Sequence, residues 1–284
     1  MIPIGACATL ACLWEVTAPK PGNVYRGADF EDLTYADFLT SAAVVGPILE
    51  RSPDEGVGAT VLAAVEATRV AVGTNTNLGM LLLLAPLAAV ARELPLSAGI
   101  VDVLKSLTPR DTREVYAAIR LAQPGGLGHL DEADVRDAHP PDISLVEAMG
   151  MAAQRDLVAR QYVNGFEQVF ATSEQIERCH KSDLPLSEAI VHGYLQLLAK
   201  LPDSLIARKC GSAAAREASD RAAAVLQSGE PGSSAYQAAV AELDCWLRSD
   251  GHRRNPGTTA DLVAAGLFVL LRDQRLNWPV RFYD

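Results

Sequence analysis

The feature that most constrains the fold of this chain is a polar stretch that runs directly into a long apolar one. Residues 73–80 read Gly-Thr-Asn-Thr-Asn-Leu-Gly-Met, and residues 81–87 read Leu-Leu-Leu-Leu-Ala-Pro-Leu. The apolar run predicts a helix buried in the centre of the core. Asn and Thr favour helix N-termini, whose free backbone N–H groups can bind an anion. Taken alone, the stretch fits an ordinary capped core helix better than an anion site.

Composition narrows the function classes. The chain has 284 residues, of which 49% are hydrophobic and 21% charged, so it can bury a sizeable core and is not expected to be disordered. Its 25 basic and 35 acidic residues give a net charge of −10. We expect no nonspecific nucleic-acid binding, because that needs a basic face. A small phosphorylated substrate stays open, since a few local cations or bound magnesium can offset the average field.

Cysteine usage and hydropathy indicate the compartment. The five cysteines are scattered and form no Cys-x-x-Cys pair, which is typical of reduced thiols in a cytoplasmic protein. Residues 2–14 are mostly apolar but lack a basic start, and Glu15 follows at once, so we expect a first helix and not a signal peptide. The uncharged stretch 74–91 contains Pro86 and is too short and interrupted to span a membrane. We therefore expect a cytoplasmic protein with no membrane association.

Helix-forming patterns dominate the chain. Alanine is abundant and aromatic residues make up only 6%, whereas strands favour β-branched and aromatic runs. No tandem repeat or long linker divides the chain, so we predict a single all-α domain over residues 1–284. The predicted architecture is a multi-helix bundle with a central apolar helix and a polar cleft formed by helix-start loops. We expect helices near 4–16, 35–50, 58–72, 97–107, 112–122, 144–170, 187–201, 213–226 and 234–247. A further helix is expected to start in the 73–80 stretch, and a last apolar helix is expected to follow the 251–261 loop and run through Leu271.

Two short loops combine helix breakers with charged side chains. Residues 19–23 read Pro-Lys-Pro-Gly-Asn and cannot continue a helix. They form either a stiff loop that presents Lys20 and Asn23 to a substrate or a plain helix-terminating turn. Further along, Pro202 and Asp203 mark a helix start that leads to Arg208-Lys209, the most compact basic pair in this acidic chain.

Two further loops could approach a ligand. Residues 123–134 carry three glycines within four positions and then His129, Asp131, Glu132 and Asp134. They match neither a dinucleotide-binding nor a P-loop pattern, and they fit either a base or magnesium site or a flexible turn with an acidic helix start. Residues 255–261 read Asn-Pro-Gly-Thr-Thr-Ala-Asp and place helix caps before another apolar helix, which repeats the pattern of residues 73–87.

Four of these motifs, in this order, resemble the triphosphoribosyl-dephospho-CoA synthase family, also called ATP:dephospho-CoA triphosphoribosyl transferases. They are Pro-Lys-Pro-Gly at 19–22, Thr-Asn-Thr-Asn-x-Gly at 74–79, Pro-Asp-Ser-x-x-Ala-Arg at 202–208 and Asn-Pro-Gly-Thr-Thr-Ala-Asp at 255–261. The resemblance spans about residues 15 to 271. It implies an all-helical enzyme that moves the triphosphoribosyl group of ATP to dephospho-CoA and releases adenine.

The resemblance also implies roles for individual residues. Lys20, Asn75, Asn77 and Arg208 would bind the nucleotide, and carboxylates would hold Mg²⁺ or stabilise the positive charge that develops on the ribose. The full set of candidates is Asp203, Asp261 and Glu66 as catalytic residues, Asp203 and Asp261 as metal ligands, and Lys20, Asn23, Asn75, Thr76, Asn77, Gly125, Gly126, Arg208, Lys209, Asn255 and Thr258 as nucleotide-binding residues.

The chain departs from the family pattern at the central loop. The family usually reads Asn-Thr-His-Lys-Gly there, and this chain has Asn77 and Leu78 in place of the histidine and the lysine. Losing that lysine removes a charge-assisted contact worth about 1.5–3 kcal/mol. Two alternatives therefore stay open: an enzyme acting on another phosphorylated precursor, for example in methanopterin or methanofuran synthesis, or a noncatalytic nucleotide-binding helical protein. We expect a monomer or a homodimer.

Overall fold

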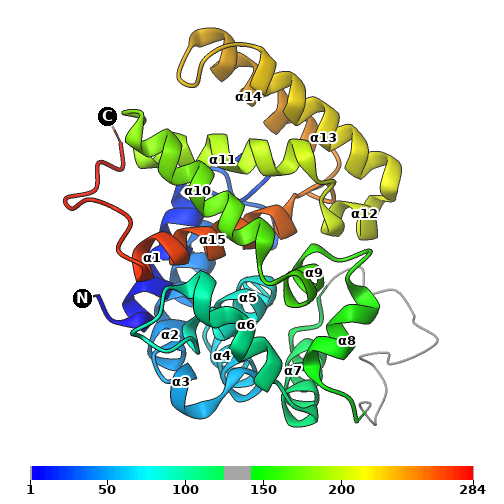
Figure 1. Ribbon diagram of the computed structural model, residues 1–284. Coiled ribbons are helices and arrows are strands. Elements are labelled where there is room, and N and C mark those ends of the chain that lie inside the picture. The colour runs from blue at the N-terminus through cyan, green and yellow to red at the C-terminus, as the bar shows by residue number, and fades with distance from the viewer. Residues whose placement is uncertain (1, 125–141, 284) are drawn as a thin grey trace.

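The computed structural model describes residues 2–124 and 142–283. Within these residues the chain forms fifteen α-helices and no strand, which confirms the all-α prediction (Figure 1). The helices are α1 Ile4–Thr17, α2 Tyr35–Leu49, α3 Ser52–Glu55, α4 Val57–Val72, α5 Leu78–Ala88, α6 Leu96–Ser106, α7 Pro109–Ala122, α8 Leu145–Ala152, α9 Leu157–Asn164, α10 Glu167–Lys181, α11 Leu186–Lys200, α12 Ser204–Cys210, α13 Ser212–Gln227, α14 Ser234–Arg248 and α15 Gly257–Arg272.

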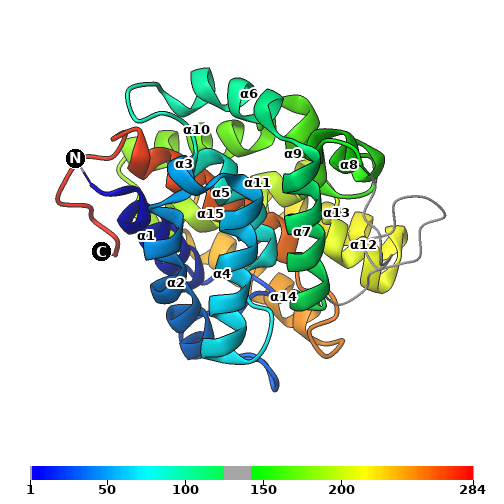
Figure 2. The same cartoon turned by 90° about the horizontal axis from the view of Figure 1, so that it is seen from below.

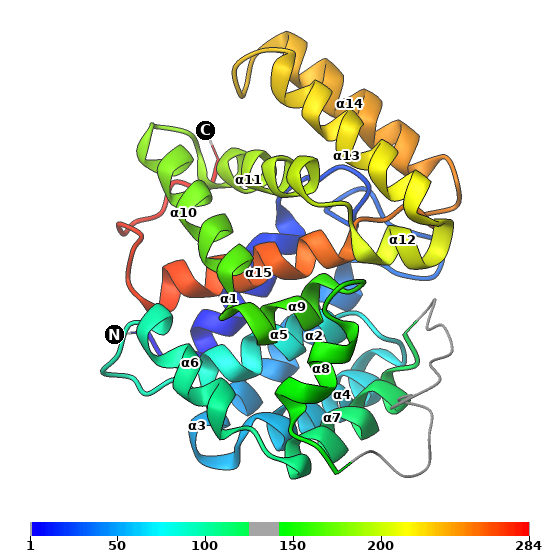
Figure 3. The same cartoon turned by 45° about the vertical axis from the view of Figure 1, so that its right-hand side comes forward.

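Two apolar helices lie in the middle of the molecule. In α15 every residue from Leu262 to Arg272 is buried, and in α5 every residue from Met80 to Ala88 is buried. Helix α15 packs against α5, α1, α10 and α11, so it is surrounded on several sides (Figure 3). Burying a large aliphatic side chain contributes about 1.5–3 kcal/mol, and these two helices therefore supply much of the stability of the core.

Other helices cover this centre in two groups. Helices α1, α2, α4 and α7 pack side by side in a row on one face (Figure 2). Helices α10 and α11 lie on the other side of α15, and the α13–α14 pair packs outside α11 (Figure 1). None of the helices in the described part of the chain is both long and apolar enough to cross a membrane.

The single helix predicted over residues 144–170 is wrong, because the chain breaks there twice. Asp156 caps a new helix, α9, by accepting hydrogen bonds from the backbone N–H groups of Val158 (2.9 Å) and Ala159 (3.1 Å). At the end of α9, Gly165 and Phe166 take left-handed backbone conformations with φ of 71° and 64°. The apolar spacing persists across both breaks, and for this reason periodicity did not reveal them.

Candidate active site

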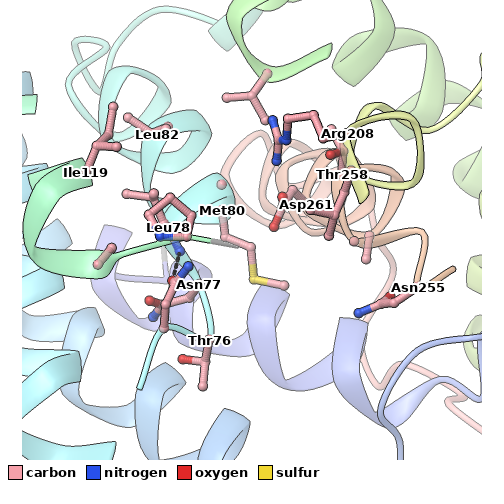
Figure 4. Close-up of a pocket in the computed structure, with 18 of the residues that line it drawn as sticks. Thr76, Asn77, Leu78, Met80, Leu82, Ile119, Arg208, Asn255, Thr258 and Asp261 are labelled. Carbon is pink, nitrogen blue, oxygen red and sulfur yellow. Dashed lines mark hydrogen bonds between the residues drawn. The ribbon is translucent and has the colours of Figure 1, made fainter. Parts of the chain in front are cut away.

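A cavity of about 840 Å³ lies where the start of α5, the start of α15 and the end of α12 meet. The loop 74–77 and the first residues of α5 line one side, and Asn255, Thr258 and Asp261 line another (Figure 4). The volume falls within the usual range for small-molecule and cofactor sites. Three of the four family-like motifs, at 74–79, 202–208 and 255–261, therefore face one pocket although they lie far apart in sequence.

The polar side chains at the start of α5 are held in place by neighbours. The Asn75 Oδ1 atom accepts a hydrogen bond from the backbone N–H of Leu78, the first residue of α5, at 3.1 Å. The Asn77 side chain is buried and donates to the Thr68 hydroxyl at 3.1 Å, while the Thr76 hydroxyl lies 2.5 Å from that of Ser41. All three predicted residues line the pocket, and these bonds orient them.

Asp261 is the carboxylate that faces the pocket most freely. Within the described residues its side chain takes part in no hydrogen bond or ion pair, unlike Glu15 and Asp156, which pair with Lys20 and Arg208. Removal from water and the negative charges of Glu15, Asp203 and Asp156 raise the pKa of Asp261 well above its usual range, against the opposing effect of Arg208. The pocket alone therefore disfavours the charged form of Asp261, and a positive charge that enters the pocket would favour it.

Gly79 makes room for this carboxylate. A Cβ atom at position 79 would lie 2.0 Å from Oδ2 of Asp261 and 2.5 Å from its Cγ. The Asp261 carboxylate therefore packs directly against the backbone of the first turn of α5. Any larger residue at position 79 must push the carboxylate away.

We expect Gly79→Ala to lower kcat/KM by about tenfold, because small displacements of a catalytic group are costly. Stability should be unchanged or fall slightly, since the better helix propensity of alanine, about 1 kcal/mol, is offset by about 1–3 kcal/mol for displacing the packed carboxylate. Steady-state kinetics and thermal melts of the two proteins measure both effects. Wild-type activity in the variant would mean that the position of Asp261 does not matter for turnover.

Four cationic side chains line the same pocket. The Arg208 guanidinium forms an ion pair with Asp156, the residue that caps α9. Arg69, Arg155 and Lys209 line the pocket with no carboxylate partner in the part of the chain that the structure describes. The predicted pair Arg208-Lys209 is thus at the pocket. Arg69 and Arg155 were not among the predicted binding residues.

The structure corrects the role of Asp203, which is fully buried and is not part of the pocket lining. Its Oδ1 atom accepts from the backbone N–H groups of Leu205 (2.8 Å) and Ile206 (3.1 Å) at the start of α12. Its Oδ2 atom accepts from the backbone N–H (2.7 Å) and hydroxyl (2.8 Å) of Thr259 in α15. Because both oxygens are used, Asp203 ties two helices together and is free neither for a metal nor for the ribose.

Lys20 and Glu66 also differ from the predictions. Lys20 is fully buried outside the pocket lining, where its ammonium pairs with the Glu15 carboxylate at 2.8 Å and donates to the backbone carbonyls of Glu15 and Ala18. The stiff loop therefore presents only Asn23 to the pocket. Glu66 is exposed on α4 and does not line the pocket, because it lies on the outer face of that helix. Sequence reasoning also missed Glu15, which lines the pocket beside this ion pair.

The remaining predicted residues divide by position. Asn255 and Thr258 line the pocket, and the Asn255 Oδ1 atom is buried with no hydrogen-bond partner, which leaves it available to a ligand. Gly125 and Gly126, with the neighbouring His129, Asp131, Glu132 and Asp134, lie outside the described residues. Within the described residues no cluster of three or more His, Cys, Asp or Glu side chains forms a ready metal site.

Comparison with known proteins identifies the family. The family model of ATP:dephospho-CoA triphosphoribosyl transferases (CitG) matches residues 2–280. The chain belongs to this family. As a member of the triphosphoribosyl transferase family it is an enzyme of the transferase class. No curated protein matches it.

A solved structure supports the same assignment. It is the crystal structure of a protein from Archaeoglobus fulgidus that is provisionally named a triphosphoribosyl-dephospho-CoA synthase. The two chains are 27% identical and superpose with a TM-score of 0.66, covering 83% of this chain and 98% of the other. This triphosphoribosyl transferase therefore shares its fold with that relative.

Proposed function

We propose that the protein transfers the triphosphoribosyl group of ATP to 3′-dephospho-CoA and releases adenine. The observation that carries this proposal is the separation of charge in the pocket of a chain that belongs to this family. Asp261 faces the cavity from the start of α15, while Arg69, Arg155 and Lys209 line the same cavity without carboxylate partners among the described residues. A ribose carrying a triphosphate has matching needs, since its reacting carbon becomes positive and its phosphates are negative.

The proposed reaction breaks the bond between the ribose C1′ atom and adenine and forms a bond from C1′ to a hydroxyl oxygen of the acceptor. The bonding electrons leave with adenine, and the hydroxyl proton balances the charge on the departing base. Positive charge builds up at the ribose while this happens, as it does in glycoside hydrolysis. Asp261 would stabilise that charge, because a carboxylate in a water-poor pocket acts more strongly than one in solution.

The phosphates would be held by the cations and by helix starts. The first turns of α5 and α15 both line the cavity, and the positive end of a helix dipole favours anions. Leu78 is buried where the family usually has a lysine, and we propose that Arg155 and Lys209 supply the charge from other elements.

Magnesium fits this arrangement only together with the substrate. Asp203 is fully used in hydrogen bonds, so Asp261 is the carboxylate left to contact the ion, with the substrate phosphates as further ligands. Mg²⁺ is commonly bound by one or two carboxylates plus substrate phosphates. Bound there, it would neutralise part of the charge of the triphosphate.

One assay tests the proposal. The purified protein is incubated with ATP, Mg²⁺ and dephospho-CoA, and adenine and the enlarged CoA product are measured by chromatography and mass spectrometry. We expect both products in equal amounts, with none when dephospho-CoA is left out. Adenine release without dephospho-CoA would indicate another acceptor, and nucleotide binding without any product would favour a noncatalytic binding protein.

A further inference from the structure

Two loops far apart in sequence form one wall of the pocket. The loop between α1 and α2 supplies Phe30, and the loop between α14 and α15 supplies His252. Their rings are stacked, with centroids 4.6 Å apart and planes 22° from parallel. Both residues line the cavity, and both keep part of their surface exposed. In a chain with only 6% aromatic residues, a stacked pair facing a polar pocket is an uncommon use of two rings.

Contacts from α14 hold this wall in place. Asp244 on α14 accepts a hydrogen bond from the Gly22 backbone N–H at 2.7 Å and pairs with Arg248 at 2.9 Å. Arg248 in turn donates to the Asn23 carbonyl, and its guanidinium carbon lies 5.3 Å from the centroids of both the Tyr25 and the Phe30 rings.

A contact between His252 and Asp32 also holds the wall in place. The His252 Nε2 atom lies 3.5 Å from a carboxylate oxygen of Asp32, which also lines the pocket. His252 takes a left-handed backbone conformation, with φ of 53°, which is uncommon for a residue other than glycine. A wall fixed by these contacts loses little further freedom when a ligand binds.

The wall lies next to the cations at the end of α12. Arg253, the neighbour of His252, donates to the Lys209 carbonyl at 2.9 Å, and this bond joins the two segments. The pocket therefore places a flat aromatic surface beside Lys209, which has no carboxylate partner among the described residues. A planar base linked to phosphate matches both features, because aromatic side chains stack on bases and cations bind phosphates.

We propose that the adenine of a nucleotide substrate stacks on the His252 ring, because the Phe30 ring behind it is already covered by His252 and by the Arg248 guanidinium. This inference rests on the proposed function, in which both substrates contain adenine. Neither residue belongs to the motifs that carry the family resemblance, so the wall is a subsite separate from Asp261 and its neighbours. ATP and dephospho-CoA both carry adenine, and binding measurements with each ligand separate the two sources.

The test measures binding of ATP, dephospho-CoA and inorganic tripolyphosphate to the wild type and to Phe30→Ala by calorimetry. We expect the variant to bind at least one adenine ligand about tenfold more weakly, because the His252 ring loses the partner that holds it as a stacking surface and stacking contributes about 1–3 kcal/mol per base. Tripolyphosphate has no base, so its affinity for the wild type and for Phe30→Ala should be nearly the same. This affinity is measured directly or by competition with ATP. The weakened ligand identifies the source of the adenine.

Two further variants keep the result interpretable. Phe30→Trp retains a ring, so it should bind nearly as well as the wild type, and its added fluorescence should be quenched by the adenine ligand but not by tripolyphosphate. Phe282→Ala removes a ring that packs against Trp14 outside the pocket, and it should leave all three affinities unchanged.

Three outcomes would overturn the stacking proposal. They are unchanged adenine affinity in Phe30→Ala, an equal loss of tripolyphosphate binding, and no quenching in Phe30→Trp saturated with nucleotide. If the wild type transfers the triphosphoribosyl group and Phe30→Ala does so with unchanged KM values, only the stacking proposal fails. If the wild type binds neither ATP nor dephospho-CoA, the proposed function fails with it.

Discussion

Asp261→Asn is expected to lower kcat for triphosphoribosyl transfer by about 10²- to 10³-fold, the usual cost of losing one group that stabilises transition-state charge. Asparagine has nearly the same shape as aspartate but cannot balance a positive ribose or contact a cation as strongly. Stability should be kept or rise slightly, because the Asp261 side chain makes no hydrogen bond within the described residues and its surroundings disfavour its charge. Steady-state kinetics and thermal melts measure the two effects.

Glu66→Gln is the matched control for this experiment. It also removes one carboxylate, and Glu66 was a catalytic candidate on sequence grounds, but it is exposed on α4 outside the pocket lining. We expect wild-type kinetics from this variant. If Asp261→Asn retained full activity, Asp261 would have no part in the reaction. If it unfolded at a much lower temperature, the carboxylate would be a structural group like that of Asp203.

Asp203→Ala is expected to destabilise the protein by about 3 kcal/mol. The substitution removes the cap of α12 and leaves the backbone N–H and hydroxyl of Thr259 without their acceptor in the core. Losing a cap typically costs about 0.5–2 kcal/mol, and each buried group left unsatisfied costs about 1–3 kcal/mol. For a chain of this size the melting temperature should fall by about 6–12 °C. Urea denaturation and thermal melts provide the measurement.

A substitution at a simpler helix cap provides a reference for this loss of stability. Ser233→Ala removes the cap of α14, where the hydroxyl accepts a single hydrogen bond of 3.3 Å from the Tyr236 backbone N–H. It should cost only about 0.5–1 kcal/mol. A stable Asp203→Ala protein that has lost all activity would contradict the structural role and restore Asp203 as a catalytic candidate.

Local patterns were sufficient for most of the fold. Helix spacing and breakers placed α1, α2, α4, α11, α13 and α14 within one or two residues of their observed ends. These features depend on neighbours in sequence, which the pattern contains directly. The breaks at Asp156 and Gly165 were missed because a side-chain cap and a left-handed residue end a helix without changing its apolar period.

The pocket was only partly predictable. The loop motifs single out Asn75, Thr76, Asn77, Arg208 and Asp261, and all five line one cavity. The motifs did not separate Asp203 from Asp261, although both carboxylates stand at or near a helix start. Thr259 and the α12 backbone use every oxygen of Asp203, whereas the absence of a side chain at Gly79 lets Asp261 face the cavity.

The stretch 73–87 shows which properties the sequence determines and which depend on the tertiary structure. By itself the sequence determined that this segment is a capped, buried helix, that the protein is all-α, and that it resembles the triphosphoribosyl transferases. Only the tertiary structure decided which charges are available. Lys20 is taken up by Glu15, Arg208 is paired with Asp156, and Arg155 is left facing the pocket. The physical reason is that ion pairs and hydrogen bonds neutralise a buried charge through partners that are distant in sequence. These partners meet only in the folded structure.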